Sequence, residues 1–270
     1  MLNSEEGNRL IGEHIVSGKP LSVIRLRSET NTLYYHLNNN YPESYPSFLE
    51  NNGGLYPLNK EIIEYYNHSL VEGITKCDYS VYWDIHKKQY DDFQKKWSIN
   101  LVHNRAVEPF YFKNPWSQHL KGKKVLVIHP FVESIISQYK KREKLFDNSL
   151  ILPSFDLLGL KSIQTSGGGE KLYPSWVASL DSMVEKIKSM DFDIALIGCG
   201  CYDIPICSTI KDMGKQAIIV GGGLQILFGI KGKRWDNHGI ISKLYNDNWV
   251  RPSSSEKPSQ FDNVEKGCYW

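Results

Sequence analysis

The chain has 270 residues, and its 32 Lys and Arg against 30 Asp and Glu give a formal net charge of +2. A balance this even excludes a histone-like or generally polybasic protein, so no nucleic-acid partner is expected. With 41% hydrophobic residues the chain is predicted to be globular rather than disordered. Its length is sufficient for one large domain.

The amino terminus and the cysteines indicate an intracellular protein. Acidic residues, Glu5 and Glu6, occupy the region where an export signal has basic ones. The five cysteines are an odd number in a chain that needs no disulfide framework, which suits a reducing compartment. The longest nearly uncharged stretch, 217–230, is too short and too rich in glycine to cross a bilayer, so no transmembrane segment is predicted. We expect a cytoplasmic protein, with peripheral attachment at a membrane and a homodimer left open.

Hydrophobic spacing predicts an alternation of helices and strands along the chain. Apolar residues in 10–15 share a helical face that Gly18 and Pro20 end, and 21–26 has the composition of a buried strand. Residues 40–58, rich in Asn, Pro, Gly and Tyr, are predicted to be a long surface loop. Further helices are expected at about 60–73, 87–97, 132–145, 175–189 and 203–213, and further strands at 79–83, 125–129, 150–152, 194–197 and 217–220.

This alternation is typical of an α/β fold with a mainly parallel sheet flanked by helices. The clearest unit, 193–223, has the pattern strand, glycine turn, helix and strand of a right-handed crossover. We predict a single Rossmann-like domain over 1–270, with 237–270 as a C-terminal tail that packs on it. Ligands of such sheets bind at the carboxyl ends of the strands, so the candidate loops are 25–30, 129–134, 198–203 and 221–236.

A glycine turn follows the strand predicted at 194–197. Gly198 and Gly200 would let the backbone turn into a helix whose free N–H groups face a phosphate or a ribose. The pattern is not a full dinucleotide fingerprint, because Asp203 stands near the place of the third glycine. The alternative is a tight turn without a ligand, in which Asp203 caps the helix. No metal ligands are predicted, since the nearby cysteines match no common zinc spacing: Cys199, Cys201 and Cys207.

A basic loop follows the last predicted strand. Lys231, Lys233 and Arg234 stand beside Trp235, after a glycine-rich strand end where cations could neutralise a diphosphate. A solvated basic turn is the alternative. Two other basic runs, 121–124 and 140–144, are assigned to no site. The first precedes a strand, and the second lies toward the end of a helix, where cations interact favourably with the helix dipole.

Two carboxylates lie near predicted strand ends. Glu108 or Glu133 could act as a general base if it were partly desolvated. The alternatives are a loop carboxylate bonded to backbone for Glu108 and a first-turn helix residue for Glu133. Among the histidines, only His129, at a strand end before a proline, is a candidate for the site.

Five segments together carry a family resemblance. They are LSVIRLRSE at 21–29, AVEPFYFKNPWS at 106–117, KKVLVIHPFVESIISQYKKREKLF at 123–146, the long segment 191–236, and VEKGCYW at 264–270. In combination they resemble the GT-D-like glycosyltransferase group of bacterial and viral surface-glycan loci. The resemblance implies a Rossmann-like domain that takes a sugar from a nucleoside-diphosphate sugar and transfers it to a hydroxyl of a glycan or lipid-linked glycan, as in polysaccharide biosynthesis.

The chain departs from that family in its acidic signatures. The family has Arg-Phe-Gly-Asp-x-Glu after the first strand, with Asp-x-Glu tied to a divalent metal. Here Arg25 carries over, but Arg27, Ser28 and Thr30 stand at the glycine, aspartate and glutamate positions. No cofactor is therefore assigned, and Mn²⁺ or Mg²⁺ stays open. The family's acidic run after the last strand is also missing from 221–228. Unless the leaving phosphate itself serves in a retaining mechanism, the base must be one of four residues: Asp236, Glu108, Glu133 or Glu265.

The leading prediction is a glycosyltransferase of the hexosyl- or pentosyltransferase class. One alternative is a non-catalytic nucleotide-sugar-binding or assembly subunit. Another is a Rossmann methyltransferase, which Val220 and Gly221 disfavour because neither offers a carboxylate to hold a ribose. Asp236, Glu108 and Glu133 are the candidate catalytic residues. The predicted nucleotide-sugar-binding residues are Arg25, Ser28, His129, Ser134, Gly198, Gly200, Tyr202, Gly222, Gln225, Lys231, Lys233, Arg234 and Trp235.

Overall fold

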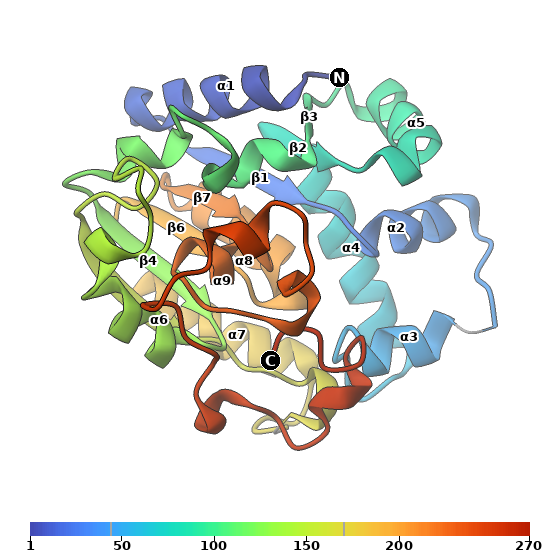
Figure 1. The fold of residues 1–270 in the computed structure, drawn as a ribbon. Helices are drawn as coiled ribbons and strands as arrows, with labels where there is room; N and C mark the ends of the chain where they lie inside the picture. Colours follow the sequence, from blue (N-terminus) through green and yellow to red (C-terminus); the bar gives the residue numbers. More distant parts are fainter. Residues whose placement is uncertain (44, 170) are drawn as a thin grey trace.

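The protein is built on one seven-stranded sheet in the order β3-β2-β1-β7-β6-β4-β5, and every adjacent pair of strands is parallel (Figure 1). The structure, a computed structural model, describes residues 1–43, 45–169 and 171–270. The predicted α/β class with a mainly parallel sheet is confirmed. The strands are β1 (Leu21–Arg25), β2 (Tyr79–Tyr82), β3 (Leu101–His103), β4 (Lys124–His129), β5 (Asp156–Lys161), β6 (Ile194–Ile197) and β7 (Gln216–Ile219).

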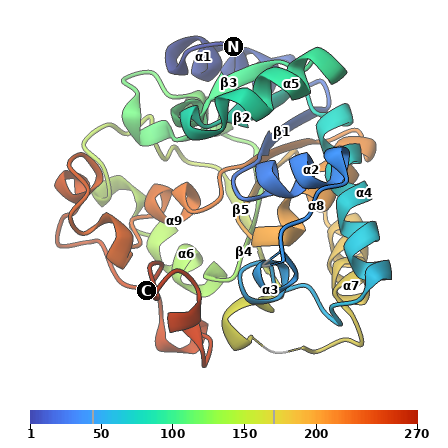
Figure 2. The ribbon, with the colours of Figure 1, turned by 90° about the vertical axis from the view of Figure 1, so that its right-hand side faces the viewer.

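Helices cover both faces of the sheet (Figure 2). Helices α2 (Glu29–Asn38), α3 (Tyr45–Asn51), α4 (Lys60–Lys76), α5 (Lys87–Trp97), α7 (Trp176–Lys188) and α8 (Asp203–Asp212) contribute to one hydrophobic cluster. Helices α1 (Ser4–Ser17), α6 (Val132–Tyr139) and α9 (Gly223–Leu227) contribute to the other. Residues of a central strand alternate between the two clusters: in β4, Leu126 and Ile128 face the first, and Val125 and Val127 the second.

Short-range signals set several helix ends. The side chain of Asn59 accepts a hydrogen bond from the N–H of Ile62 at the start of α4, and Ser175 does the same for Ala178 at the start of α7. Gly18, with φ of 68°, ends α1 in the left-handed conformation that glycine adopts without strain. The helices predicted near 60, 87, 175 and 203 begin within a residue of the observed ones, and side-chain caps account for the starts of two of them, α4 and α7.

The strand predicted at 150–152 is wrong. Ile151 and Leu152 are buried, but they belong to a connecting segment, and the edge strand β5 begins at Asp156. Because these two residues are apolar and buried, as strand residues are, their composition alone did not distinguish the connecting segment from a strand. At the centre of β5, a Cβ on Gly159 would lie 2.6 Å from Cγ2 of Val132, so a glycine there lets α6 pack closely on the strand.

The loop predicted at 40–58 is also corrected, because it contains α3 and several buried side chains, among them Leu49 and Leu55. Helix α2, immediately before it, was not predicted. The helix expected over 132–145 ends at Tyr139, and a short 3₁₀ turn follows at Arg142–Lys144. No helix in the described part of the chain is long and apolar enough to span a membrane.

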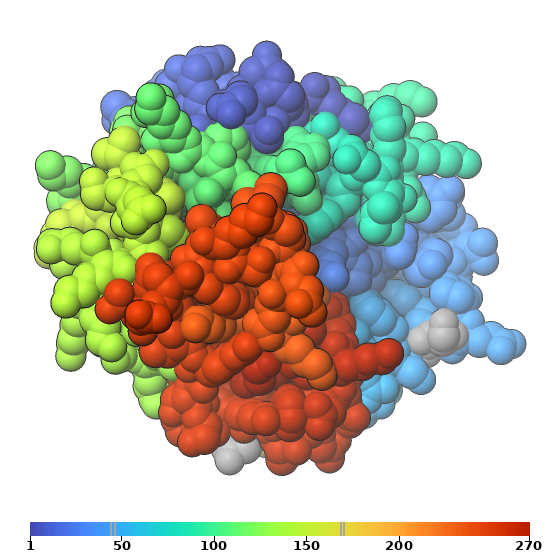
Figure 3. Space-filling model, in the orientation of Figure 1, coloured from blue at the N-terminus to red at the C-terminus, as the bar shows by residue number. Residues whose placement is uncertain are grey.

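The connections create a crevice at the carboxyl edge of the sheet. The helices that follow β1 and β6 pack on one face, whereas those that follow β4 and β7 pack on the other. Divergent connections of this kind leave a gap between the loops, which is where open α/β sheets bind ligands. The C-terminal segment reaches this edge: Arg234 donates its backbone N–H to the carbonyl of Cys268 at 3.0 Å. Figure 3 shows the C-terminal residues, in orange and red, over the centre and bottom of one face of the molecule.

Candidate functional site

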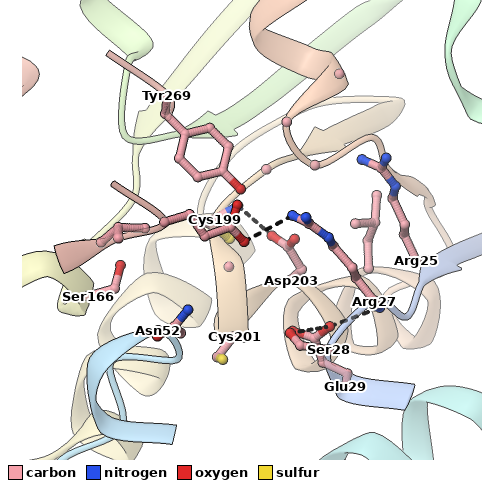
Figure 4. Close-up of a pocket in the computed structure, with 18 of the residues that line it drawn as sticks. Arg25, Arg27, Ser28, Glu29, Asn52, Ser166, Cys199, Cys201, Asp203 and Tyr269 are labelled. Atoms are coloured by element: carbon pink, nitrogen blue, oxygen red, sulfur yellow. Dashed lines mark hydrogen bonds and ion pairs between the residues drawn. The ribbon is translucent and has the colours of Figure 1, made fainter. Parts of the chain in front are cut away.

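A cavity of about 760 Å³ lies at the carboxyl edge of the sheet. Arg25, His129, Gly198 and Gly221, which end or follow the four neighbouring strands β1, β4, β6 and β7, all line it. Its volume is within the range of sites that hold cofactor-sized ligands. Figure 4 shows Arg27, Asp203 and Tyr269 directed into the same space from the end of β1, the start of α8 and the C-terminal segment.

The structure brings ten of the sixteen predicted site residues to this cavity: Arg25, Ser28, Glu108, His129, Gly198, Gly200, Tyr202, Gly222, Arg234 and Trp235. The other six are not among its lining residues. Glu133 is exposed and pairs with Lys161 at 3.0 Å, and Asp236 accepts two hydrogen bonds from Arg251 at 2.8 Å. The remaining four are Ser134, Gln225, Lys231 and Lys233.

These four side chains have other surroundings. Ser134 donates its hydroxyl to the buried Glu256, and Gln225 donates to the carbonyls of Lys231 and Tyr269. The ammonium of Lys231 lies 5.3 Å from the ring centre of Tyr245, and Lys233 is exposed to solvent. Of the basic loop, only Arg234 contributes a cation to the cavity lining.

Arg25 contacts three parts of the protein. Its guanidinium donates to the carbonyl of Val220 at 2.5 Å and to Oε1 of Glu108 at 3.0 Å, and it lies 5.0 Å from the ring centre of Trp83. Burial raises the pKa of Glu108 above its ordinary value, and the charge of Arg25 only partly opposes this effect. Arg25 therefore joins β1, the end of β7 and the 104–111 segment, although its buried Nε has no hydrogen-bond partner among the described residues.

Two other arginines converge on a single carboxylate. Arg27 pairs with Oε1 of Glu265 at 3.2 Å, and Arg234 pairs with Oε2 of the same group. The guanidinium of Arg234 also lies 4.6 Å from the ring centre of Tyr269. Two guanidinium groups around one carboxylate form a site that suits an anion with several oxygens.

The backbone that presents Glu265 adopts an uncommon conformation. Glu265, Lys266 and Gly267 have φ values of 47°, 59° and 70°, so two residues with side chains sit in the left-handed region. Such strain persists only where surrounding contacts hold it in place. Here the two arginine pairs provide that support for Glu265.

Asp203 places a carboxyl with an unusual pKa in the cavity. It begins α8, and its carboxylate accepts a hydrogen bond from the backbone N–H of Cys199 at 2.5 Å. Because Cys199 precedes the helix and α8 has no side-chain cap, the capping role predicted for Asp203 is wrong. Burial raises the pKa of Asp203 to about 7 in spite of this hydrogen bond. The negative charge of Glu29 raises it further, and Arg25 opposes the shift. A carboxyl that titrates near neutral pH can both hold and release a proton under working conditions.

His129 is held as a neutral ring behind the glycine turn. Burial lowers its pKa to about 3, and its Nδ1 accepts a hydrogen bond from the N–H of Phe131 at 2.9 Å. The ring proton therefore resides on Nε2. A Cβ on Gly198 would lie 2.8 Å from Cδ2 of this ring and 2.9 Å from the carbonyl oxygen of Gly221, so only glycine fits at the end of β6.

The described residues do not fit the divalent-metal site that the family resemblance implies. No group of three or more His, Cys, Asp and Glu side chains in the ranges 1–43, 45–169 and 171–270 is arranged to hold a metal ion. Thr30, at the position of the family's glutamate, is buried and hydrogen-bonds Tyr90 at 2.9 Å. Burial raises the pKa of Cys199 and Cys201, so these groups are thiols and not metal-binding thiolates.

Sequence reasoning missed three residues of the site. Arg27 appeared only as a departure from a family motif, and Asp203 only as a helix cap. Tyr269 gave no signal, because a C-terminal aromatic residue is equally common in a packed tail. The signal that could have identified Arg27 and Asp203 is their position, two and six residues after the last residues of β1 and β6.

No protein-family model and no curated protein matches the chain. Two solved structures are similar to it. One is a selenomethionine-substituted structure of domain of unknown function 1792, with a TM-score of 0.51 and 14% identity over 96% of this chain and 93% of that one. The other has a TM-score of 0.47 and 13% identity over the same shares, and is described as "The highly conserved domain of unknown function 1792 has a distinct glycosyltransferase fold". Both are structures of the same domain, and the first shows that the chain has its fold, as the sequence resemblance implied.

Proposed function

We propose that this protein is a glycosyltransferase that binds a nucleoside-diphosphate sugar in the 760 Å³ cavity and transfers its sugar to a glycan hydroxyl. The observation that carries the proposal is the convergence of Arg27 and Arg234 on one carboxylate, in the same cavity as Asp203. Sugar transfer from such a donor needs both parts: cations for the departing diphosphate, and a base for the incoming hydroxyl.

The diphosphate takes the place of the Glu265 carboxylate. Phosphate oxygens match the forked geometry of two guanidinium groups, and the diphosphate carries more charge than the single carboxylate that it displaces. Negative charge grows on the diphosphate as the bond to the anomeric carbon breaks. Arg27 and Arg234, already positioned at the cavity, stabilise this charge in the transition state.

Asp203 serves as the general base. The acceptor oxygen forms a bond to the anomeric carbon, its proton passes to the Asp203 carboxylate, and the nucleoside diphosphate leaves with the electrons of the broken bond. A single displacement of this kind inverts the anomeric configuration. A pKa of about 7 suits the task, because the group is substantially deprotonated at neutral pH and still accepts a proton readily. Glu108, the cavity carboxylate predicted from the sequence, is the alternative base, but one of its oxygens is bonded to Arg25.

The donor part is tested by thermal-shift screening against nucleoside-diphosphate sugars, since a ligand that binds the folded state raises the melting temperature. We expect stabilisation by at least one donor, and we expect Arg234→Ala to abolish it. Lys233→Ala is the matched control, because it removes the same charge from the adjacent, exposed residue. Equal stabilisation of both variants, or no stabilisation of the wild type by any donor, would count against the proposal.

Catalysis is separated from mere binding by release of nucleoside diphosphate. A non-catalytic nucleotide-sugar-binding subunit would be stabilised by its ligand and would release none. The enzyme should release it, and Asp203→Asn should lower kcat by about 10²- to 10⁴-fold while donor stabilisation remains, since this is the usual contribution of a general base.

A further inference from the structure

A second, smaller cavity of about 210 Å³ lies between α2 and the chain that leads into α3. Three residues, Ser28, Asn31 and Phe48, line both this cavity and the large one, so the two adjoin. We call the smaller cavity the side slot. Its lining consists of Ser28, Asn31, Thr32, Tyr35, Pro42, Tyr45 and Phe48.

The α2 wall of the side slot is polar. Ser28, Asn31 and Tyr35 are spaced three and four residues apart, so they lie on one face of the helix. Within the described residues, the amide of Asn31 and the hydroxyl of Tyr35 make no hydrogen bond, although each can both donate and accept one. A ligand in the side slot would therefore meet unused polar groups one helical turn apart.

The opposite wall is aromatic and held in place. The hydroxyl of Tyr45 donates to Oδ1 of Asn67 at 3.0 Å, so the ring of this buried residue is anchored from behind. Its ring centre lies 6.0 Å from that of Tyr35, with the two planes at 88°. Phe48 stands one turn further along α3, at the junction of the two cavities. Aromatic faces contact apolar C–H groups, while the polar wall serves hydroxyl groups.

We propose that the side slot binds one sugar ring of the acceptor glycan. A sugar ring has the matching amphipathic character, because one face presents C–H groups and its edge presents hydroxyl groups. The side slot, at about 210 Å³, has less than a third of the volume of the 760 Å³ cavity, which suits a single ring rather than a whole donor. This inference rests on the proposed function, since it places an acceptor ring beside the cavity that holds the donor.

The slot also explains how an acceptor would be oriented toward the base. Ser28 and Asn31 border both cavities, and Asp203 lines the larger one. A ring that packs on the half-buried Phe48 and bonds to Asn31 can thus extend a hydroxyl through the junction into the space of the donor. Asn31 and Tyr35 are then positioning and specificity residues, whereas Asp203 remains the catalytic one.

The test compares Asn31→Ala and Tyr35→Phe with the wild type, using 4-nitrophenyl glycosides of common hexoses and N-acetylhexosamines as acceptor probes. Loss of one hydrogen bond in each variant should raise the acceptor KM about fivefold relative to the donor KM. Tyr65→Phe, which removes a hydroxyl from an exposed tyrosine of α4, is the control and should leave both constants unchanged. An acceptor KM that stays at the wild-type value in both slot variants would overturn the proposal.

A binding measurement keeps this inference separable from the proposed function. Saturation-transfer NMR should detect contact between the glycoside ring protons and the wild-type protein, and the signal should weaken in Asn31→Ala. If the wild type cleaves no donor but its NMR signal from the glycoside weakens in Asn31→Ala, the proposed catalysis is wrong and the proposed sugar binding in the side slot is supported. If no glycoside contacts the wild type, with or without a stabilising nucleotide, the slot proposal is wrong whatever the activity.

Discussion

Replacing the carboxyl of Asp203 by an amide should make the protein more stable, by an amount that depends on pH. In the folded chain the pKa of Asp203 is raised from its ordinary 3.8 to about 7. Between these two values the folded chain keeps a proton that the unfolded chain has lost, so the contribution of this group to stability falls as the pH rises. Asp203→Asn has no such proton to lose, and its oxygen can still accept the hydrogen bond from the N–H of Cys199.

The magnitude follows from the size of the shift. About three pH units, at about 1.4 kcal/mol each, correspond to about 4 kcal/mol of stability lost by the wild type between pH 4 and pH 7. For a chain of this size, 1 kcal/mol changes the melting temperature by about 2 °C. The difference in melting temperature between Asp203→Asn and the wild type should therefore grow by about 8 °C over this range and then stay level above pH 7.

The assay is thermal unfolding of both proteins at half-unit steps from pH 4 to pH 9. Asp181→Asn, an exposed carboxylate of α7, is the control for a general effect of charge, and its difference from the wild type should not vary with pH in this way. A constant difference between Asp203→Asn and the wild type across the range would contradict the raised pKa, because it would mean that folding leaves the proton affinity of Asp203 unchanged.

Other predictions concern the ion pairs of Arg27 and Arg234 with Glu265, the glycine turn at Gly198 and the metal. Glu265→Gln removes the charge that competes with the diphosphate for Arg27 and Arg234, in two partly exposed ion pairs of ~0.2–1 kcal/mol each. Calorimetry should therefore show that a stabilising nucleoside diphosphate binds about 2- to 30-fold more tightly to this variant. Unchanged or weaker binding would contradict the displacement of the Glu265 carboxylate by the diphosphate. Gly198→Ala, which brings a Cβ to 2.8 Å from the His129 ring, should lose about 1–3 kcal/mol in chemical denaturation, whereas Gly239→Ala, with open space around it, should not. Turnover should persist in EDTA, since the described residues offer no cluster of metal ligands; complete loss that added Mn²⁺ restores would show a metal requirement.

The part of the fold that surrounds the site could be predicted from the sequence, because its strands are buried on both faces. Such strands are continuous apolar runs with clear ends, as in β1, β4, β6 and β7, whose burial patterns are almost uniformly buried. The edge strand β5 has no such run. It starts at Asp156, ends at Lys161 and contains a glycine, because an edge strand is only half covered.

Helices α2 and α3 escaped prediction for a related reason. Both helices have largely polar outer faces and border a cavity, so their hydrophobic periodicity is weak. The Asn, Pro and Gly residues around them also give the segment the composition of a loop. Their identification needed the tertiary structure that buries Leu33 and Leu49. The side slot between them was accordingly invisible in the sequence.

The site itself could be located but not resolved in detail. Strand ends placed Arg25, His129 and Gly198 at the right edge, because the carboxyl ends of parallel strands meet there. Within a loop, however, no periodicity fixes the direction of a side chain, so the sequence could not separate Arg234 from Lys233. The raised pKa of Asp203 depends on burial by distant segments, which adjacent residues do not encode.

Glycosyltransferase activity is tested most directly by following sugar transfer by NMR, with the wild-type protein, a panel of nucleoside-diphosphate sugars and 4-nitrophenyl glycosides in one vessel. We expect that one donor disappears as free nucleoside diphosphate and a new glycosidic linkage appear in equal amounts, with inverted anomeric configuration, and that Arg234→Ala forms neither product. Binding of donors without release of nucleoside diphosphate, or no interaction with any of them, would contradict the proposed activity.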